Sequence, residues 1–87
     1  MKVTILGSHL CQDTMYALMK MKDCDAIVEF CNISVDFSAL KKFMKLRENQ
    51  SDFQTVKEND KIGMPFFLLE DGTETHDLIS VLGKLQE

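Results

Sequence analysis

The residues best suited to do chemistry lie in the segment Gly7–Thr14, which reads Gly-Ser-His-Leu-Cys-Gln-Asp-Thr. The apolar run Val3–Leu6 before it predicts a strand, and Met15–Lys22 after it has the spacing of a helix. Cys11 therefore stands at a strand-to-helix junction. Backbone N–H groups without helical partners and the positive end of the helix dipole favour a thiolate there. We identify Cys11 as the candidate nucleophile; the alternative is a small buried apolar residue that begins a helix.

Two neighbours bear on the charge of this sulfur. Thr14 lies one helical turn after Cys11, so its hydroxyl could donate a hydrogen bond to the thiolate. Asp13, in the first turn, suits the helix dipole but disfavours a second negative charge beside it. We therefore predict that Thr14 assists Cys11 and that Asp13 opposes it.

The other cysteines and the histidines give weaker signals. The chain has three cysteines, and an odd number without an apolar signal segment argues for a reducing compartment and against a disulfide framework. Cys24 is expected in a polar turn and Cys31 at the end of a strand, buried and inert; a role for either as a resolving thiol stays open. There is no Cys-x-x-Cys pair, and His9 and His76 are isolated, so no metal site is predicted.

Composition limits the classes of function. The chain of 87 residues, with 45% hydrophobic and 28% charged residues, predicts one globular domain spanning residues 1–87. A net charge of −4 and the lack of a basic cluster disfavour nucleic acid and anionic membranes as partners. No apolar run approaches the ~20 residues of a membrane span, so a cytoplasmic protein is expected. The oligomeric state is left open.

Eight elements must position the candidate site. In the first half of the chain we expect a strand over 2–6, a helix from 11 or 12 to about 22, a strand over 26–33, and a helix from its N-cap Asp36 to about Arg47. A short helix over 52–58 should follow, after a Ser51–Gln54 capping box. In the last part we expect a strand entered at Pro65, a hairpin turn over 70–73, a short strand at 74–75, and a helix capped by Thr75 or Asp77 that ends near Leu85.

The same patterns predict which residues face inward. Met15, Leu18 and Met19 share one face of the first helix and are expected in the core. The strand over 26–33 is expected to be covered on nearly both sides. The inward face of the second helix is expected to contain Phe37, Leu40, Phe43 and Met44.

The element order predicts the sheet. A β-α-β opening implies two parallel strands joined by a right-handed crossover, and a β-β-α close adds an antiparallel pair. The expected fold class is α/β, with a four-stranded mixed sheet flanked by helices on both faces.

This order, with a cysteine heading the first helix and a proline opening the third strand, resembles the thioredoxin superfamily, and glutaredoxins most closely. Ser8–Thr14 stands in the place of the family's C-P-Y-C loop, and Met64-Pro65 in that of its cis-proline pair. The small size and the lack of elements before the first strand favour glutaredoxin over thioredoxin. Lys61–Pro65 followed by Glu70–Gly72 is similar to a group of small bacterial glutaredoxin-related proteins.

The resemblance implies a thioredoxin-like fold and a thiol–disulfide oxidoreductase in which Cys11 attacks a disulfide. It also implies that Met64 pairs its backbone with the substrate as an added strand, ahead of a cis peptide bond at Pro65. Glutathione is the implied co-substrate, alongside protein thiols and disulfides, with no tightly bound cofactor. The substrate-binding residues implied by the resemblance are Ser8, His9, Leu10, Gln12, Met64, Pro65 and Asp77.

The departures from the family pattern leave two hypotheses. Thr14 replaces the second cysteine, giving a monothiol C-x-x-T loop, and Gln12 replaces the loop proline. Ser8 stands where many glutaredoxins carry a basic residue for glutathione, and of the γ-glutamyl contacts only Asp77 falls near its place. The first hypothesis is a cytoplasmic monothiol oxidoreductase acting on glutathione mixed disulfides or protein disulfides. The alternative is a redox-inactive thioredoxin-fold binding or regulatory module.

Overall fold

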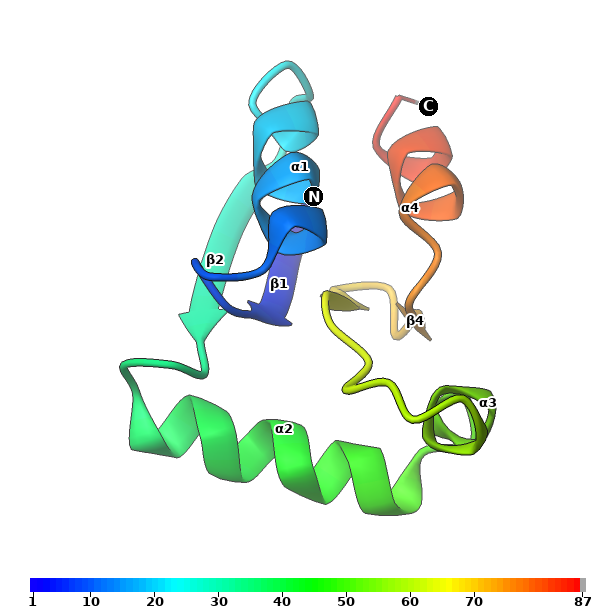
Figure 1. Ribbon diagram of the computed structural model, residues 1–87. Helices are drawn as coiled ribbons and strands as arrows, with labels where there is room; N and C mark the ends of the chain where they lie inside the picture. The colour runs from blue at the N-terminus through cyan, green and yellow to red at the C-terminus, as the bar shows by residue number, and fades with distance from the viewer. Residues whose placement is uncertain (87) are drawn as a thin grey trace.

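The computed structural model describes residues 1–86, and its element order is the predicted one (Figure 1). The elements are β1 (Lys2–Gly7), α1 (Gln12–Met21), β2 (Ile27–Asn32), α2 (Phe37–Asn49), α3 (Phe53–Glu58), β3 (Phe66–Leu69), β4 (Glu74–Thr75) and α4 (Leu78–Leu85). Among the helices of these residues, none has both the length and the apolar character needed to cross a membrane.

The strands form one four-stranded mixed sheet in the order β2-β1-β3-β4. β1 runs parallel to β2 and antiparallel to β3, and β4 is antiparallel to β3. Leu6 on the central strand β1 lies opposite Cys31 on one side and Phe66 on the other. The prediction of an α/β domain with a mixed sheet of four strands is therefore confirmed.

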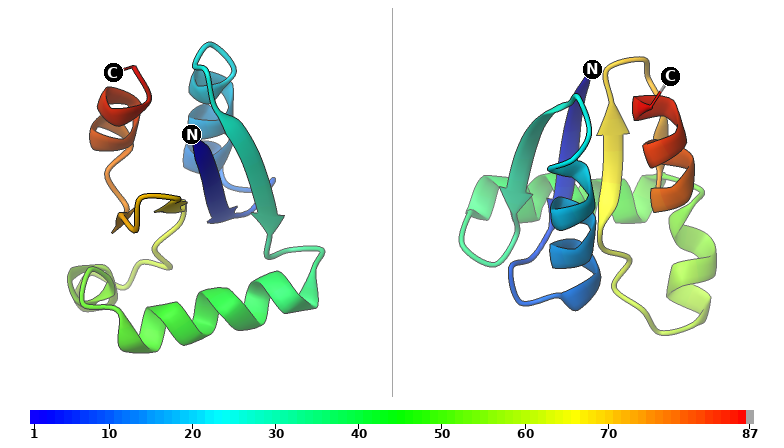
Figure 2. Two further views of the ribbon diagram at one scale, coloured as in Figure 1. Left: turned by 180° about the vertical axis from the view of Figure 1, so that it is seen from behind. Right: turned by 90° about the horizontal axis from the view of Figure 1, so that it is seen from above.

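Helices cover both faces of the sheet, as Figure 2 shows from above. One core cluster joins α1 and α4 to Val3 and Ile5 of β1, and the other joins α2 and α3 to Leu6 of the same strand. This division follows from the alternation of side chains along a strand. Phe53 of α3 is the centre of the second cluster, with its ring centroid 4.8 Å from that of Phe66.

The predicted inward face of α1 is wrong for Met15 and Met19, whereas Leu18 packs against the core as predicted. The buried residues of this helix are Thr14, Ala17 and Met21, whereas Met15 and Met19 are 46% and 58% exposed. Thr14 packs directly against Gly7, so the helix approaches β1 through its small residues and the two methionines turn outward.

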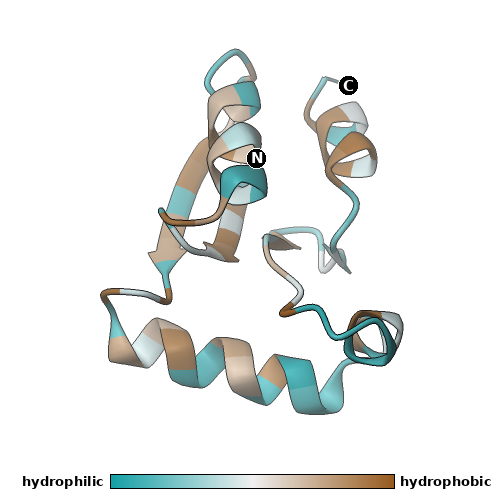
Figure 3. Ribbon diagram, viewed as in Figure 1, coloured by the Kyte–Doolittle hydropathy of each residue, from teal (hydrophilic) through white to brown (hydrophobic). Residues whose placement is uncertain are grey.

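Two other burial predictions are also wrong. Phe43 and Ala39 are buried in α2, but Phe37 is 70% exposed and Met44 also faces solvent, because the buried stripe of this helix is narrower than its apolar pattern. β2 is an edge strand whose first residues, beginning with Ile27, are exposed, although Figure 3 colours most of this strand as hydrophobic.

Of the three predicted helix caps, two form. Asp36 accepts hydrogen bonds from the N–H groups of Ser38 and Ala39, and Asp77 caps α4 in the same way. The capping box before α3 does not form. The side chain of Gln50 accepts from the Asp52 N–H, and the backbone carbonyl of Ser51 accepts from the Gln54 N–H.

Candidate functional site

Cys11 is the residue immediately before α1, in an extended conformation with φ −97° and ψ 121°. Its N–H donates to the carbonyl of Ser8 at 3.0 Å, and its own carbonyl accepts from Met15 at 3.1 Å. These two bonds fix the turn from β1 into the helix. In the part of the chain that the structure describes, the Cys11 side chain makes no capping hydrogen bond.

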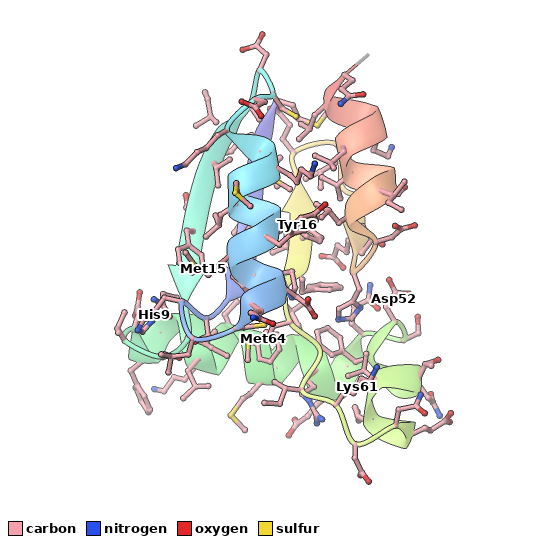
Figure 4. All side chains as sticks on the ribbon, turned by 45° about the horizontal axis from the view of Figure 1, so that its top comes forward. His9, Met15, Tyr16, Asp52, Lys61 and Met64 are labelled. Carbon is pink, nitrogen blue, oxygen red and sulfur yellow. The ribbon has the colours of Figure 1, made fainter. Side chains whose placement is uncertain are left out.

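Cys11 borders a groove of about 520 Å³ that we call the Pro65 groove. One wall comes from α1, through Cys11, Asp13 and Tyr16. The other walls come from α3 and the segment after it and from the β4–α4 connection, through Val56, Lys61, Ile62, Gly63, Met64, Pro65, His76 and Leu78. Figure 4 shows Met64 beside the N-terminal end of α1 and Tyr16 further along that helix. The fold thus brings together Cys11 and the Met64–Pro65 pair.

The peptide bond between Met64 and Pro65 is cis, as the resemblance implied. Both residues line the Pro65 groove, and β3 begins directly after them at Phe66. These two predicted site residues are therefore in the same groove as the candidate nucleophile.

His9, Leu10 and Gln12 lie on another side of Cys11. They line a trough of about 690 Å³ along the outer face of α1, which also contains the exposed Met15 and Met19. The side-chain amide of Asn32 donates to Nδ1 of His9 at 2.9 Å, tying this loop to the end of β2. The trough and the Pro65 groove share Cys11, Asp13 and Tyr16.

The structure gives Ser8 and Thr14 places other than the predicted ones. Ser8 is only 2% exposed, and its Oγ accepts from the Leu10 N–H at 3.0 Å and shares a hydrogen bond with Oγ of Ser34. Thr14 is fully buried, and its Oγ1 accepts from the Ser8 N–H at 3.4 Å. The residues described include no hydrogen bond from Thr14 to Cys11. We correct both assignments: burial turns these hydroxyls inward, where they shape the loop before Cys11.

Asp77 also differs from its predicted role. Its Oδ1 accepts from the N–H groups of Ile79 and Ser80 at 3.1 and 3.3 Å, and its side chain lines neither the groove nor the trough. Its carboxylate thus occupies the N-terminal end of α4, where an anionic group of a ligand would otherwise be favoured.

His76 belongs to the site although its sequence context gave no sign of it. Its Nε2 lies 2.9 Å from the carbonyl oxygen of Gly63, and its ring centroid lies 4.4 Å from that of Phe53 and 4.6 Å from that of Phe66. Burial lowers the pKa of His76, partly offset by the Gly63 carbonyl and by the charge of Asp52. Tyr16 was also missed; its three-residue spacing from Asp13, which places both on one helical face, was the available signal.

The other two cysteines lie apart from the groove. Cys31 packs against the cluster under α2 and α3, and burial, followed by the charge of Glu29, raises the pKa of its thiol. Cys24 packs near the C-terminal end of α1, the end opposite Cys11. All three cysteines are free. Neither Cys24 nor Cys31 lines a hollow with Cys11.

The charged groups of the Pro65 groove are few. Asp13 and Lys61 are its charged residues, set on opposite walls, and the remaining lining is mainly apolar. Across residues 1–86, no group of three or more His, Cys, Asp or Glu side chains is arranged to hold a metal ion.

Comparison with models of protein families, with curated proteins and with solved structures found no match for this chain.

Proposed function

We propose that this protein is a monothiol thiol–disulfide oxidoreductase with a thioredoxin-like fold, related to glutaredoxins, and that Cys11 is its nucleophile. The observation that carries the proposal is that Cys11 and the Met64–Pro65 pair, far apart in the sequence, line one groove. A second support is the position of Cys11, which directly precedes α1 and lines the groove without a side-chain cap bond to the helix.

The reaction is a disulfide exchange. The thiolate of Cys11 attacks one sulfur of the substrate disulfide, the S–S bond breaks, and the other sulfur leaves as a thiolate. The product is a mixed disulfide on Cys11. Because Thr14 stands where a second cysteine would resolve it, a thiol from outside, from glutathione or a protein, attacks next and releases Cys11.

The substrates proposed are glutathione mixed disulfides or protein disulfides. The apolar walls of the groove, formed in part by Tyr16, Ile62 and Leu78, suit the side chains of an extended segment. Among residues 1–86, Lys61 is the one Lys or Arg of the groove lining that could meet a carboxylate. Three free thiols suit a reducing compartment, so we propose a cytoplasmic location.

Brief treatment with oxidised glutathione at neutral pH, followed by intact-mass measurement and peptide mapping, tests the proposal. A single glutathione adduct on Cys11, reversed by reduced glutathione, is the expected result. A disulfide from Cys11 to Cys24 or Cys31 would contradict the monothiol route. A folded protein whose Cys11 stays unmodified would contradict the enzyme altogether.

The alternative function is a binding or regulatory module without turnover. The trough along α1 favours it, because Leu10, Met15 and Met19 expose apolar surface beside Cys11 that the enzyme mechanism does not use. If Cys11 stays unmodified by oxidised glutathione in the folded protein, the binding module is favoured over the oxidoreductase.

A further inference from the structure

Two side chains hold the segment that leads into Met64. Nη2 of Arg47 donates to the carbonyl of Lys61 at 2.8 Å, and Nε of the same guanidinium donates to the carbonyl of Ile62 at 3.0 Å. Nε2 of His76 donates to the next carbonyl, that of Gly63, at 2.9 Å. Three successive carbonyl groups are thus bound from two directions, by the end of α2 and by the connection into α4.

The same segment is pressed against α3. The N–H of Lys61 donates to the carbonyl of Val56 at 2.9 Å. Gly63 has φ +95°, and a Cβ there would lie 2.8 Å from the Phe53 ring and 2.9 Å from the Val56 side chain. Only glycine adopts this conformation in this space without strain. The segment is therefore also held by its packing against α3.

The hydrogen bonds that hold residues 61–63 do not continue to Met64. Within the described chain, neither the N–H nor the C=O of Met64 makes a hydrogen bond, and the residue lines the groove next to Cys11. An extended polypeptide can pair with such open backbone groups as an added strand. A backbone held in place before the substrate arrives loses less entropy when it binds.

We propose that Arg47 and His76 are positioning residues that hold residues 61–63 so that the open backbone of Met64 meets an extended polypeptide carrying the reacting cysteine. This inference rests on the proposed function, in which Cys11 attacks that cysteine. The partner is a polypeptide segment, since a disulfide without peptide groups has nothing to pair with Met64. Neither side chain touches the reacting sulfur.

The guanidinium suits this role because its planar fork donates to two carbonyl oxygens at once. A lysine ammonium is a single point charge without this fixed geometry. Arg47 binds exposed carbonyl groups that water can reach when the side chain is lost, so Arg47→Lys is expected to fold. The Gly63 carbonyl bound by His76 is part-buried, and the aromatic ring kept in His76→Phe preserves the packing on Phe53 and Phe66. The expected change is therefore in substrate binding more than in stability.

The test uses two probes with the same leaving group. One is a blocked peptide of alanines around a single cysteine that is disulfide-linked to thionitrobenzoate; the other is 2-mercaptoethanol linked in the same way. Cys11 bonds to the peptide or mercaptoethanol sulfur, and coloured thionitrobenzoate leaves as a thiolate. Single-turnover rates against probe concentration give a half-saturating concentration and a limiting rate.

The variants are Arg47→Lys, which removes the fork, and His76→Phe, which keeps the ring but removes the donor. We expect each to raise the half-saturating concentration of the peptide probe about tenfold, equivalent to ~1.4 kcal/mol. For Arg47→Lys, whose side chain does not line the groove, the limiting rate and the rate with the mercaptoethanol probe should change less than about twofold. His76→Gln keeps a hydrogen-bond donor, so its half-saturating concentration should lie closer to that of the wild type. The control Lys45→Met, on α2, should have the same half-saturating concentration as the wild type.

Unchanged peptide saturation in both variants, with wild-type protein reacting normally, would overturn the positioning role and leave the oxidoreductase standing. Equal losses on the two probes would also overturn it, because the effect would then lie at the sulfur. Wild-type protein that releases no thionitrobenzoate from either probe would overturn the proposed function and this inference with it. If one variant does not fold, as judged by circular dichroism, the other still decides the question.

Discussion

Nε2 of His76 lies 2.9 Å from the carbonyl oxygen of Gly63, and this contact joins the residues before α4 to the segment before Met64. A carbonyl only accepts hydrogen bonds, so the neutral ring carries its proton on Nε2. The same ring packs against both Phe53 and Phe66. One side chain therefore connects the core under α3 to one wall of the Pro65 groove.

This relationship predicts a dependence of stability on pH. Burial lowers the pKa of His76, so the folded protein binds fewer protons than the unfolded chain below the ordinary value of about 6.5. Its contribution to the free energy of unfolding is present above that pH. It is lost as the pH falls through the lowered pKa. Urea unfolding between neutral pH and about pH 5 measures this loss.

The charged groups of the surrounding elements are Asp52, Asp13, Lys61 and Asp77. Histidine is the side-chain type whose ordinary pKa lies near pH 6. His76→Phe should therefore flatten the fall in stability near pH 6, the region of the ordinary value. His9→Gln is the matched control, because it removes the other histidine of the chain at an exposed position outside the core. An unchanged slope in His76→Phe would show that another group is responsible.

Two glycines give opposite predictions for the same substitution. A Cβ on Gly7 would lie 2.5 Å from Oγ1 and 2.7 Å from Cγ2 of the buried Thr14, so Gly7→Ala should destabilise the protein by ~1–3 kcal/mol. Gly83 lies inside α4 with open space around it, so Gly83→Ala should stabilise by ~0.5–1 kcal/mol. Thermal or urea unfolding of both variants compares them; a shift in the same direction for both would contradict the packing described.

The element order and the sheet could be predicted because their signals are local. Strand-like runs, caps and the Asp71-Gly72 turn each act over a few residues. The helix faces could not be predicted in the same way. Apolar spacing favoured Met15 as a core residue, but the actual face depends on Gly7, whose missing side chain admits Thr14. The contact between Gly7 and Thr14 joins a strand to a helix, so it produces no periodic pattern in the sequence of either element.

The site shows the same division. Cys11 could be proposed from its place at a strand-to-helix junction and Pro65 from its place at a strand entry, whereas Met64 was proposed only through the family resemblance. Arg47 and His76 could not, since their partners are backbone carbonyls of a segment that only the folded chain brings near them. Backbone acceptors are present at every position and therefore give no sequence signal.

The helix caps separate three aspartates of similar sequence context. Asp36 and Asp77 accept backbone N–H groups at the starts of α2 and α4, so Asp36→Ala and Asp77→Ala should each cost ~1 kcal/mol. Asp52 precedes α3 without a side-chain cap bond, and Asp52→Ala should stay within about 0.5 kcal/mol of wild type. Urea unfolding distinguishes them, and equal losses at all three would argue against this assignment of caps.

Cys31 should be the slow thiol of the chain. Burial and the charge of Glu29 raise its pKa, and Sγ lies 3.8 Å from Oε1 of Glu29. Alkylation by iodoacetamide, followed residue by residue with mass spectrometry, should therefore require a higher pH at Cys31 than a free thiol does. Glu29→Gln should shift that requirement to lower pH, whereas removal of the more distant Asp25 by Asp25→Asn should not. An unshifted profile in Glu29→Gln would mean that burial alone acts.

The assignment of the nucleophile predicts a sharp asymmetry among the three cysteines. Cys11→Ser should abolish reduction of a glutathione mixed disulfide, because a serine hydroxyl does not form the anion that attacks a disulfide at neutral pH. Cys24→Ser and Cys31→Ser should keep activity within about twofold, as neither thiol lines the groove. The assay follows glutathione release from a small mixed disulfide with excess reduced glutathione as the second thiol. Circular dichroism checks that each variant is folded. Full activity in Cys11→Ser would move the reaction to another residue. Loss of activity in Cys31→Ser with Cys11 intact would reveal a resolving thiol, although Cys31 does not line the Pro65 groove.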